Sequence, residues 1–234
     1  MMKIPGKSAA KTYQSLLTIA AEVFAEKGYR NATIAEICRH AGANISAVNY
    51  HFGDKENLYR EAWRHSFLES IKAHPPDGGV SDDSPLEERL QGRVTALLHR
   101  IADENNKDFF ILHKELVNPT GLLEEAIRKE LGPLHEKMEA LVRELLGPRV
   151  SDIKVRFCVT SIISQCINPM VARKGWKAKR EAKGGPWGVE DINAYASHVV
   201  KFSLAGIRAI RKEAEEKKSN SKMKRSLGDA LEQD

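Results

Sequence analysis

The sequence predicts an all-α protein, and three observations support this prediction. Apolar side chains recur at intervals of three and four residues along most of the chain, which is the spacing of one helix face. Glycine, proline and capping residues divide this pattern into segments of helical length. No segment shows the alternation of apolar and polar residues that a half-buried strand requires.

The N-terminal part of the chain divides into four short or medium helices. The first covers 12–27 and ends at Gly28, because glycine favours the conformation that stops a helix. Thr33 and Glu36 have the spacing of a capping box, so a second helix is expected there, ending at Gly42. Two more helices are expected at 46–52 and from Asp54 to about residue 72.

A stretch rich in proline, glycine and aspartate, AHPPDGGVSDDSP, separates these helices from the rest of the chain. We expect a small domain at 1–72 and a larger helical bundle at 85–218. The remaining residues, 219–234, are polar and mixed in charge, so we expect a disordered tail. The helices expected in the bundle are 85–103, 108–117, 120–146, 151–172 and 189–218.

Composition narrows the classes of function. A net charge of +5 favours an anionic partner. No nucleophile–base pair, metal-ligand spacing or phosphate-binding loop is present, so we expect no enzyme activity, no metal and no cofactor. The basic N-terminus lacks the apolar core of a signal peptide, and no apolar run is long enough to span a membrane. We therefore expect a cytoplasmic protein that does not contact membranes.

The helices at 33–40 and 46–52, joined by the tight turn AGAN, predict a helix-turn-helix. The second helix of this motif enters the DNA major groove. Its first side chains, Ser46 and Ala47, are short and allow close approach, and Asn49 is suited to bidentate contact with adenine. Thr33 offers a hydroxyl and a helix N-terminus to a phosphate, and Tyr50 and His51 reach the sugar-phosphate chain. The alternative is that Asn49, Tyr50 and His51 are ordinary surface residues.

The segment from Thr12 to Phe67 resembles the DNA-binding domain of the TetR family of transcriptional repressors. The stretches that carry the resemblance are AAEVFAEKGYRNATIAEICRHAG and YHFGDKENLY. It implies phosphate contacts from Thr33, Tyr50, His51 and Lys55, and base-facing positions at Asn44, Ser46, Ala47 and Asn49. A lysine in the first turn of a helix is disfavoured by the helix dipole, so we expect Lys55 to have an anionic partner. A narrower resemblance, to the CecR-like subgroup, lies in NISAVNYHFG and HKELVNPTGLLEEAIRKELGPLHEKMEALV.

The helix at 153–171 is apolar on most of its faces, which predicts burial on all sides. One face is expected on its own bundle, and another on a second copy of the chain, together with the 190–210 helix. A dimer would also place two reading helices about 34–36 Å apart, as successive major grooves require. The expected interface residues are Phe157, Ile162, Met170, Tyr195, Val199 and Phe202.

An effector pocket in the bundle would be apolar with a few polar groups. The candidates are Phe109, Phe110, His113, Val117, Met138, Ser161, Gln165 and Asn168. The alternatives are core packing for the two phenylalanines, a surface role for His113, and interface hydrogen bonds for Gln165 and Asn168. The sequence therefore predicts a dimeric repressor that a small-molecule effector, still unidentified, releases from a near-palindromic operator in double-stranded DNA. The alternative is a non-specific or architectural DNA-binding protein without an effector.

Overall fold

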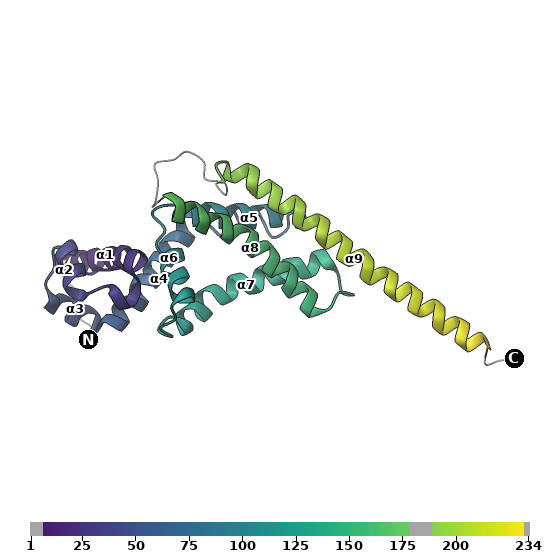
Figure 1. Cartoon of the computed structure of the whole chain (residues 1–234), viewed down its shortest axis with the longest axis horizontal. Coiled ribbons are helices and arrows are strands. Elements are labelled where there is room, and N and C mark those ends of the chain that lie inside the picture. The colour runs from purple at the N-terminus through teal and green to yellow at the C-terminus, as the bar shows by residue number, and fades with distance from the viewer. Residues whose placement is uncertain (1–6, 178–188, 232–234) are drawn as a thin grey trace. The chain divides into compact units, whose positions relative to one another are not determined.

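The computed structural model describes residues 7–177 and 189–231, and regular structure in these ranges is entirely helical (Figure 1). This confirms the all-α class. None of the helices in these ranges is long and apolar enough to cross a membrane. The helices are α1 (Lys7–Asn31), α2 (Ile34–Ala41), α3 (Ile45–Phe52), α4 (Lys55–Ala73), α5 (Leu86–Ala102), α6 (Asp108–Val117), α7 (Glu124–Leu146), α8 (Asp152–Lys177) and α9 (Ile192–Leu231).

The described residues form two compact units. The first unit combines the chain up to Pro75 with Arg100–Pro133, and the second combines Pro76–His99 with the chain from Leu134 onward. The first unit is therefore larger than the expected 1–72 domain. The reason is that α6, which we placed in the C-terminal bundle, packs against α1 and α4.

The first unit is built around α1 and α4, which pack on each other and on α6, while α2 and α3 pack beside them (Figure 1). On these helices, apolar side chains recur at helical spacing. They therefore lie on one face of each helix and are buried in a shared core. Burying each such side chain contributes about 1.5–3 kcal/mol. The fully or almost fully buried side chains include Leu16, Phe24, Ile37, Val48, Phe52, Leu58, Tyr59 and Trp63.

The second unit places α8 and α9 side by side. Their facing side chains form a core that includes Val155, Val159, Cys166, Ala196 and Ile207. Side chains at the ends of α5 also contact α9: the imidazole of His99 lies 2.8 Å from the amide oxygen of Asn193, and Arg208 pairs with Glu87.

Several element boundaries differ from those expected. Helix α1 covers Lys7–Asn31 rather than 12–27, with Gly28 as a non-helical residue inside it. Helix α7 begins at Glu124 rather than at Thr120, because the Thr120 hydroxyl donates to Glu115 instead of capping the helix. Helix α8 continues to Lys177, and the rest of the loop expected at 173–188 lies outside the described residues. The expected disordered tail is helical as far as Leu231, and good helix formers are frequent there.

Candidate nucleic-acid interface

Helix α2 is capped at its start by Thr33 and ends at Gly42, in the tight turn that leads into α3. Thr33 is extended and caps α2, accepting a hydrogen bond from the Glu36 amide at 3.2 Å. The other half of the expected capping box is replaced, since the Glu36 carboxylate binds Lys27 Nζ at 2.5 Å, and this bond lowers the pKa of Glu36. Gly42 ends α2 with φ 62°, a left-handed conformation that L side chains rarely adopt.

Helix α3 is anchored on one side and exposed on the other. Val48 and Phe52 are buried, whereas Ser46 and Asn49 are exposed and Tyr50 is 79% exposed. A short amphipathic helix with an exposed polar face can enter a major groove while its apolar face holds it to the domain. The structure thus places the expected reading residues on a free surface.

The start of α3 differs in detail from the expectation. Asn44 caps the helix, and its amide oxygen accepts a hydrogen bond from the Ala47 amide at 2.8 Å. This bond uses one of the two lone pairs of the Asn44 amide oxygen, and the side-chain N–H groups stay available for a base. Ala47 is half-buried, whereas Ile45, which we did not select, is 52% exposed. Its place at the first position of the reading helix was the signal that could have identified it.

Tyr13 of α1 packs against the end of the reading helix. Its ring stacks on Phe52 at 5.0 Å and meets His51 edge-on at 5.5 Å. Burial raises the pKa of Tyr13. His51 is therefore half-buried between two aromatic rings, because the Tyr50 ring also meets it edge-on at 4.9 Å, while Tyr50 itself remains largely exposed. Nothing in the local sequence of α3 indicated Tyr13, because it lies far away along the chain.

Lys55, the first residue of α4, has an aromatic partner. Its ammonium lies over the ring of Tyr29, 4.4 Å from the centroid, and partial burial lowers its pKa. The negative face of the ring supplies the favourable electrostatics that we expected from an anion.

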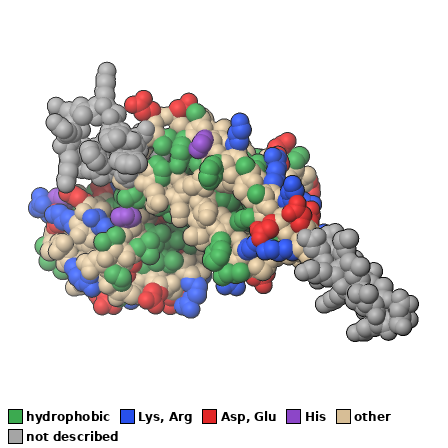
Figure 2. All heavy atoms as spheres, turned by 45° about the vertical axis from the view of Figure 1, so that its right-hand side comes forward, with side chains coloured by type: hydrophobic (Ala, Val, Ile, Leu, Met, Phe, Trp, Pro, Cys, Tyr) green, Lys and Arg blue, Asp and Glu red, His purple; other side chains and the backbone are tan. Residues whose placement is uncertain are grey.

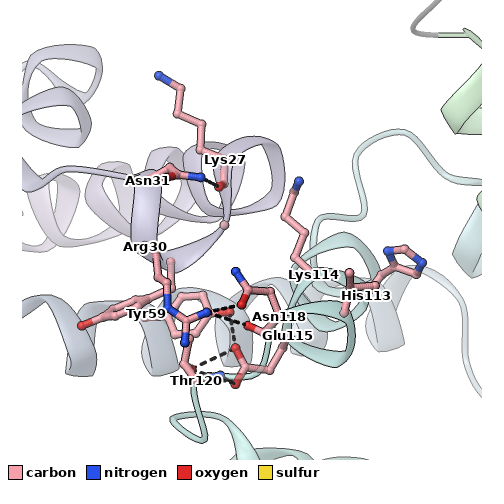
Figure 3. Close-up of a pocket in the computed structure, with 12 residues that line it drawn as sticks. Lys27, Arg30, Asn31, Tyr59, His113, Lys114, Glu115, Asn118 and Thr120 are labelled. Atoms are coloured by element: carbon pink, nitrogen blue, oxygen red, sulfur yellow. Dashed lines mark hydrogen bonds between the residues drawn. The ribbon is translucent and has the colours of Figure 1, made fainter.

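A cavity of about 320 Å³ lies beside these residues in the first unit (Figure 3). It is formed by the end of α1, by Tyr59 of α4 and by the end of α6. Arg30 crosses from α1 to donate hydrogen bonds to the side chain of Asn118 and, at 3.0 Å, to the carbonyl of Pro119. Of the expected effector residues, His113 and Val117 line this cavity, together with Lys27, Gly28, Tyr29, Arg30, Asn31, Tyr59, Lys114, Glu115, Asn118 and Thr120.

A buried carboxylate connects α4, α6 and the loop after α6. Glu115 accepts a hydrogen bond from the Tyr59 hydroxyl at 3.1 Å and from the amides of Thr120 and Gly121 at 2.8 and 3.0 Å. Figure 3 shows the Glu115 carboxylate beside Thr120, whose hydroxyl also donates to it at 2.8 Å. Burial, followed by the nearby Glu115 charge, raises the pKa of Tyr59, so this phenol stays protonated.

The remaining effector candidates have mixed surroundings. Phe109 and Met138 are buried, and Phe109 meets the ring of Phe110 at 5.3 Å. Ser161 and Asn168 are exposed, and the Gln165 side chain donates to the Ser161 carbonyl on its own helix at 3.1 Å. The first unit holds Phe109, Phe110, His113 and Val117, and the second holds Met138, Ser161, Gln165 and Asn168.

Two of the expected dimer residues require correction. Ile162 and Val199 are buried within a single copy, because α8 and α9 cover each other on those faces. Phe157 and Phe202, by contrast, are 62% and 64% exposed, and so is about half of Ile153. Tyr195 is half-buried and donates its hydroxyl hydrogen to the Gln165 carbonyl at 2.9 Å. The side chain of Met170 lies outside the described residues.

The face of the molecule drawn in Figure 2 is mixed in character. On the face drawn in Figure 2, hydrophobic side chains are exposed in several places, and basic side chains are interspersed with acidic ones. The net positive charge is therefore not gathered into one large block on that face.

The turn, the caps and the exposed reading helix define a helix-turn-helix DNA-binding protein. The chain belongs to the TetR family: residues 16–62 match the model "Bacterial regulatory proteins, tetR family", and 86–207 match the C-terminal domain of the HTH-type transcriptional dual regulator CecR. This confirms the resemblance seen in the sequence. The members of the family that resemble this chain are transcriptional regulators rather than enzymes.

Individual relatives agree with this assignment. CecR from Shigella flexneri is 28% identical over 223 residues, covering 88% of this chain and 96% of the relative. The regulator AcrR from the same organism is 33% identical, covering 76% of this chain and 86% of the relative.

Solved structures share the fold. The fatty acid degradation regulator FadR from Bacillus halodurans has a TM-score of 0.64 at 18% identity, covering 88% of this chain and 99% of that one. FadR from Bacillus subtilis, solved in complex with stearoyl-CoA, has a TM-score of 0.63 at 18% identity, covering 83% of this chain and 98% of that one.

Proposed function

We propose that this DNA-binding regulator is a dimeric repressor that binds a near-palindromic operator and leaves it when a small molecule binds. The observation that carries the proposal is that the reading helix α3 is buried on one face and exposed on the other. Val48 and Phe52 hold it in the core, and Ser46 and Asn49 face solvent. A fixed helix with free polar side chains can distinguish base pairs by hydrogen bonding in the major groove.

The contacts divide into two groups. Thr33, Tyr50, His51 and Lys55 bind phosphates, and these contacts set the register without reading sequence. Asn44, Ser46, Ala47 and Asn49 face the bases. Asn49 is the main reader, because its exposed amide carries both a donor and an acceptor for adenine.

The exposed phenylalanines of the second unit support dimerisation. Phe157 on α8 and Phe202 on α9 would cost free energy if left in water, and a second copy can cover both. Two identical surfaces pack by a twofold axis, which presents two reading helices to a palindromic site.

Release by an effector is supported by a solved structure of similar fold, FadR from Bacillus subtilis, which holds stearoyl-CoA. A ligand can drive release only if it binds the free conformation better than the DNA-bound one. The effector of this protein is a small molecule of unassigned class, and a thermal-shift screen of lipophilic compounds is the direct way to find it.

DNA binding is tested with duplexes selected by the purified protein from a random pool. Fluorescence anisotropy should give a preference for the selected duplex over random duplex of about a thousandfold or more at fixed salt. Asn49→Ala should reduce that preference by about tenfold to a hundredfold, since a bidentate contact discriminates by about 1–3 kcal/mol. Equal affinity of the unaltered protein for all duplexes would favour the architectural alternative.

A matched control is available for the Asn49 substitution. Asn105 lies exposed between α5 and α6, so Asn105→Ala makes the same chemical change outside the reading helix. The preference of this variant for the selected duplex over random duplex should equal that of the unaltered protein. An equal loss in both variants would show that α3 is not the reader.

A further inference from the structure

We propose that Tyr29 is a positioning residue for DNA binding, whose ring holds the Lys55 side chain in place to meet a phosphate. This inference rests on the phosphate contact assigned to Lys55 in the proposed function. Tyr29 itself touches no DNA in this scheme. It acts on the lysine alone, and nothing in the local sequence of either residue indicates the pairing.

The contact between the two side chains is direct. Lys55 Nζ lies 4.4 Å from the centre of the Tyr29 ring, within the range of a cation–π interaction. A free lysine has four flexible methylene groups and loses that freedom when it binds a phosphate. A lysine already held by a ring has less freedom left to lose, so it binds more tightly for the same contact.

The ring is itself fixed by the surrounding helices. Gly28, with φ 74° and ψ 171°, interrupts α1 and redirects the chain immediately before Tyr29. The Tyr29 ring then packs against Tyr59 at 5.1 Å and Phe24 at 6.4 Å. Tyr59 is only 1% exposed and is bonded to Glu115 of α6. Lys55 therefore rests on a half-buried ring that packs against core aromatic residues.

The acidic groups nearest to this ring are already engaged. Asp54 and Glu56 act electrostatically on Tyr29 and flank Lys55 in the chain. The Asp54 carboxylate caps α4 by accepting from the Asn57 amide at 2.7 Å. Glu56 pairs with Arg60 at 3.4 Å. The Tyr29 ring is thus the group that sets the position of the Lys55 ammonium, whose N–H groups can still point to a phosphate.

The test is a double-mutant cycle between Tyr29→Leu and Lys55→Gln in the full chain. Binding to random duplex and to a duplex selected by the protein is measured by anisotropy over a salt series. Lys55→Gln should weaken binding to both duplexes by a similar factor. It should also reduce the slope of log affinity against log salt concentration by about one per protomer. Tyr29→Leu should weaken binding by about two- to fivefold, the range of an exposed cation–π contact, with the slope unchanged.

In the Lys55→Gln background, Tyr29→Leu should change affinity by less than about twofold, because the group it positions is gone. Tyr29→Phe keeps the ring and should bind like the unaltered protein. Thermal unfolding of each variant separates lost fold from lost positioning. Should Tyr29→Leu unfold the domain, the comparison of Tyr29→Phe with Tyr29→Trp decides, since tryptophan is the better cation partner and should bind at least as tightly as phenylalanine.

The outcomes separate the two proposals. If Lys55→Gln leaves affinity and salt slope unchanged, the phosphate contact is wrong, and the role of Tyr29 is overturned with it. If Lys55→Gln weakens binding but Tyr29→Leu has the same effect in both backgrounds, only the positioning role is overturned. Weaker binding by Tyr29→Trp than by Tyr29→Phe, at equal thermal stability, also contradicts it.

Discussion

At the scale of single residues, Glu115 is a buried carboxylate that joins several parts of the first unit. Its carboxylate is buried and accepts from the Tyr59 hydroxyl, the Thr120 hydroxyl and the amides of Thr120 and Gly121. A buried charge without such donors would be strongly destabilising. Glu115 thereby fixes the loop after α6 to helix α4.

Removal of these bonds should be visible in the free energy of unfolding. Glu115→Ala should destabilise the protein by about 2–4 kcal/mol, because buried amides and a phenol lose their acceptor. Tyr59→Phe, which removes one bond to the carboxylate and keeps the ring, should cost about 1.5–3 kcal/mol. Chemical denaturation followed by circular dichroism measures both.

Glu69 is exposed on α4, so Glu69→Ala provides the matched control and should stay within about 0.5 kcal/mol of the unaltered protein. If Glu115→Ala were as stable as this control, the hydrogen bonds to Glu115 would contribute nothing net to folding.

At the scale of elements, the reading helix depends on the turn before it. Gly42 has φ 62°, and its amide bonds back to the Cys38 carbonyl to end α2. The space around it is open, so the backbone angle, and not crowding, is what requires glycine. This conformation lets the chain leave α2 and enter the turn that leads to α3.

Gly42→Ala should therefore destabilise the protein by about 1–2 kcal/mol, the cost of a left-handed conformation for an L residue. Gly42→Asn should cost less, because asparagine tolerates that region. Differential scanning calorimetry should give the highest midpoint temperature of unfolding for glycine at this position, a lower one for asparagine and the lowest for alanine. Alanine equal to glycine would mean that the turn changes conformation in solution.

At the scale of the whole molecule, the exposed face of α8 and α9 is the feature that bears on assembly. Ile153, Phe157 and Phe202 are large apolar side chains that a single copy leaves in water. Charged substitutions on such a face are not expected to disturb the core of one copy, because they add no buried charge there. They prevent association by placing a charge at the centre of the proposed interface.

Phe157→Glu combined with Phe202→Glu should convert the proposed dimer to a monomer and weaken operator binding by at least tenfold. Sedimentation velocity and anisotropy measure the two effects. Leu116, which is 70% exposed on α6 in the first unit, gives the control Leu116→Glu. A double variant that stays dimeric would place the interface elsewhere, and a control that also becomes monomeric would show a non-specific effect.

The sequence by itself determined the all-α class, the turn, and the exposure of Ser46, Asn49 and Tyr50 on the reading helix. These features follow from local rules: Gly42 tolerates φ 62°, Thr33 can cap α2, and the spacing of Val48 and Phe52 points both to one side of α3. Family membership followed from the same local stretch. The local predictions that differed include the tail, the start of α7 and the end of α8.

Only the tertiary structure decided which residues meet across long separations in the chain. It placed Tyr29 under Lys55 and Tyr59 against Glu115, and it buried Ile162 while leaving Phe157 exposed on the same apolar helix. The physical reason is that burial depends on which neighbouring helix covers a face. An apolar spacing pattern is the same whether that neighbour is α9, another copy or water.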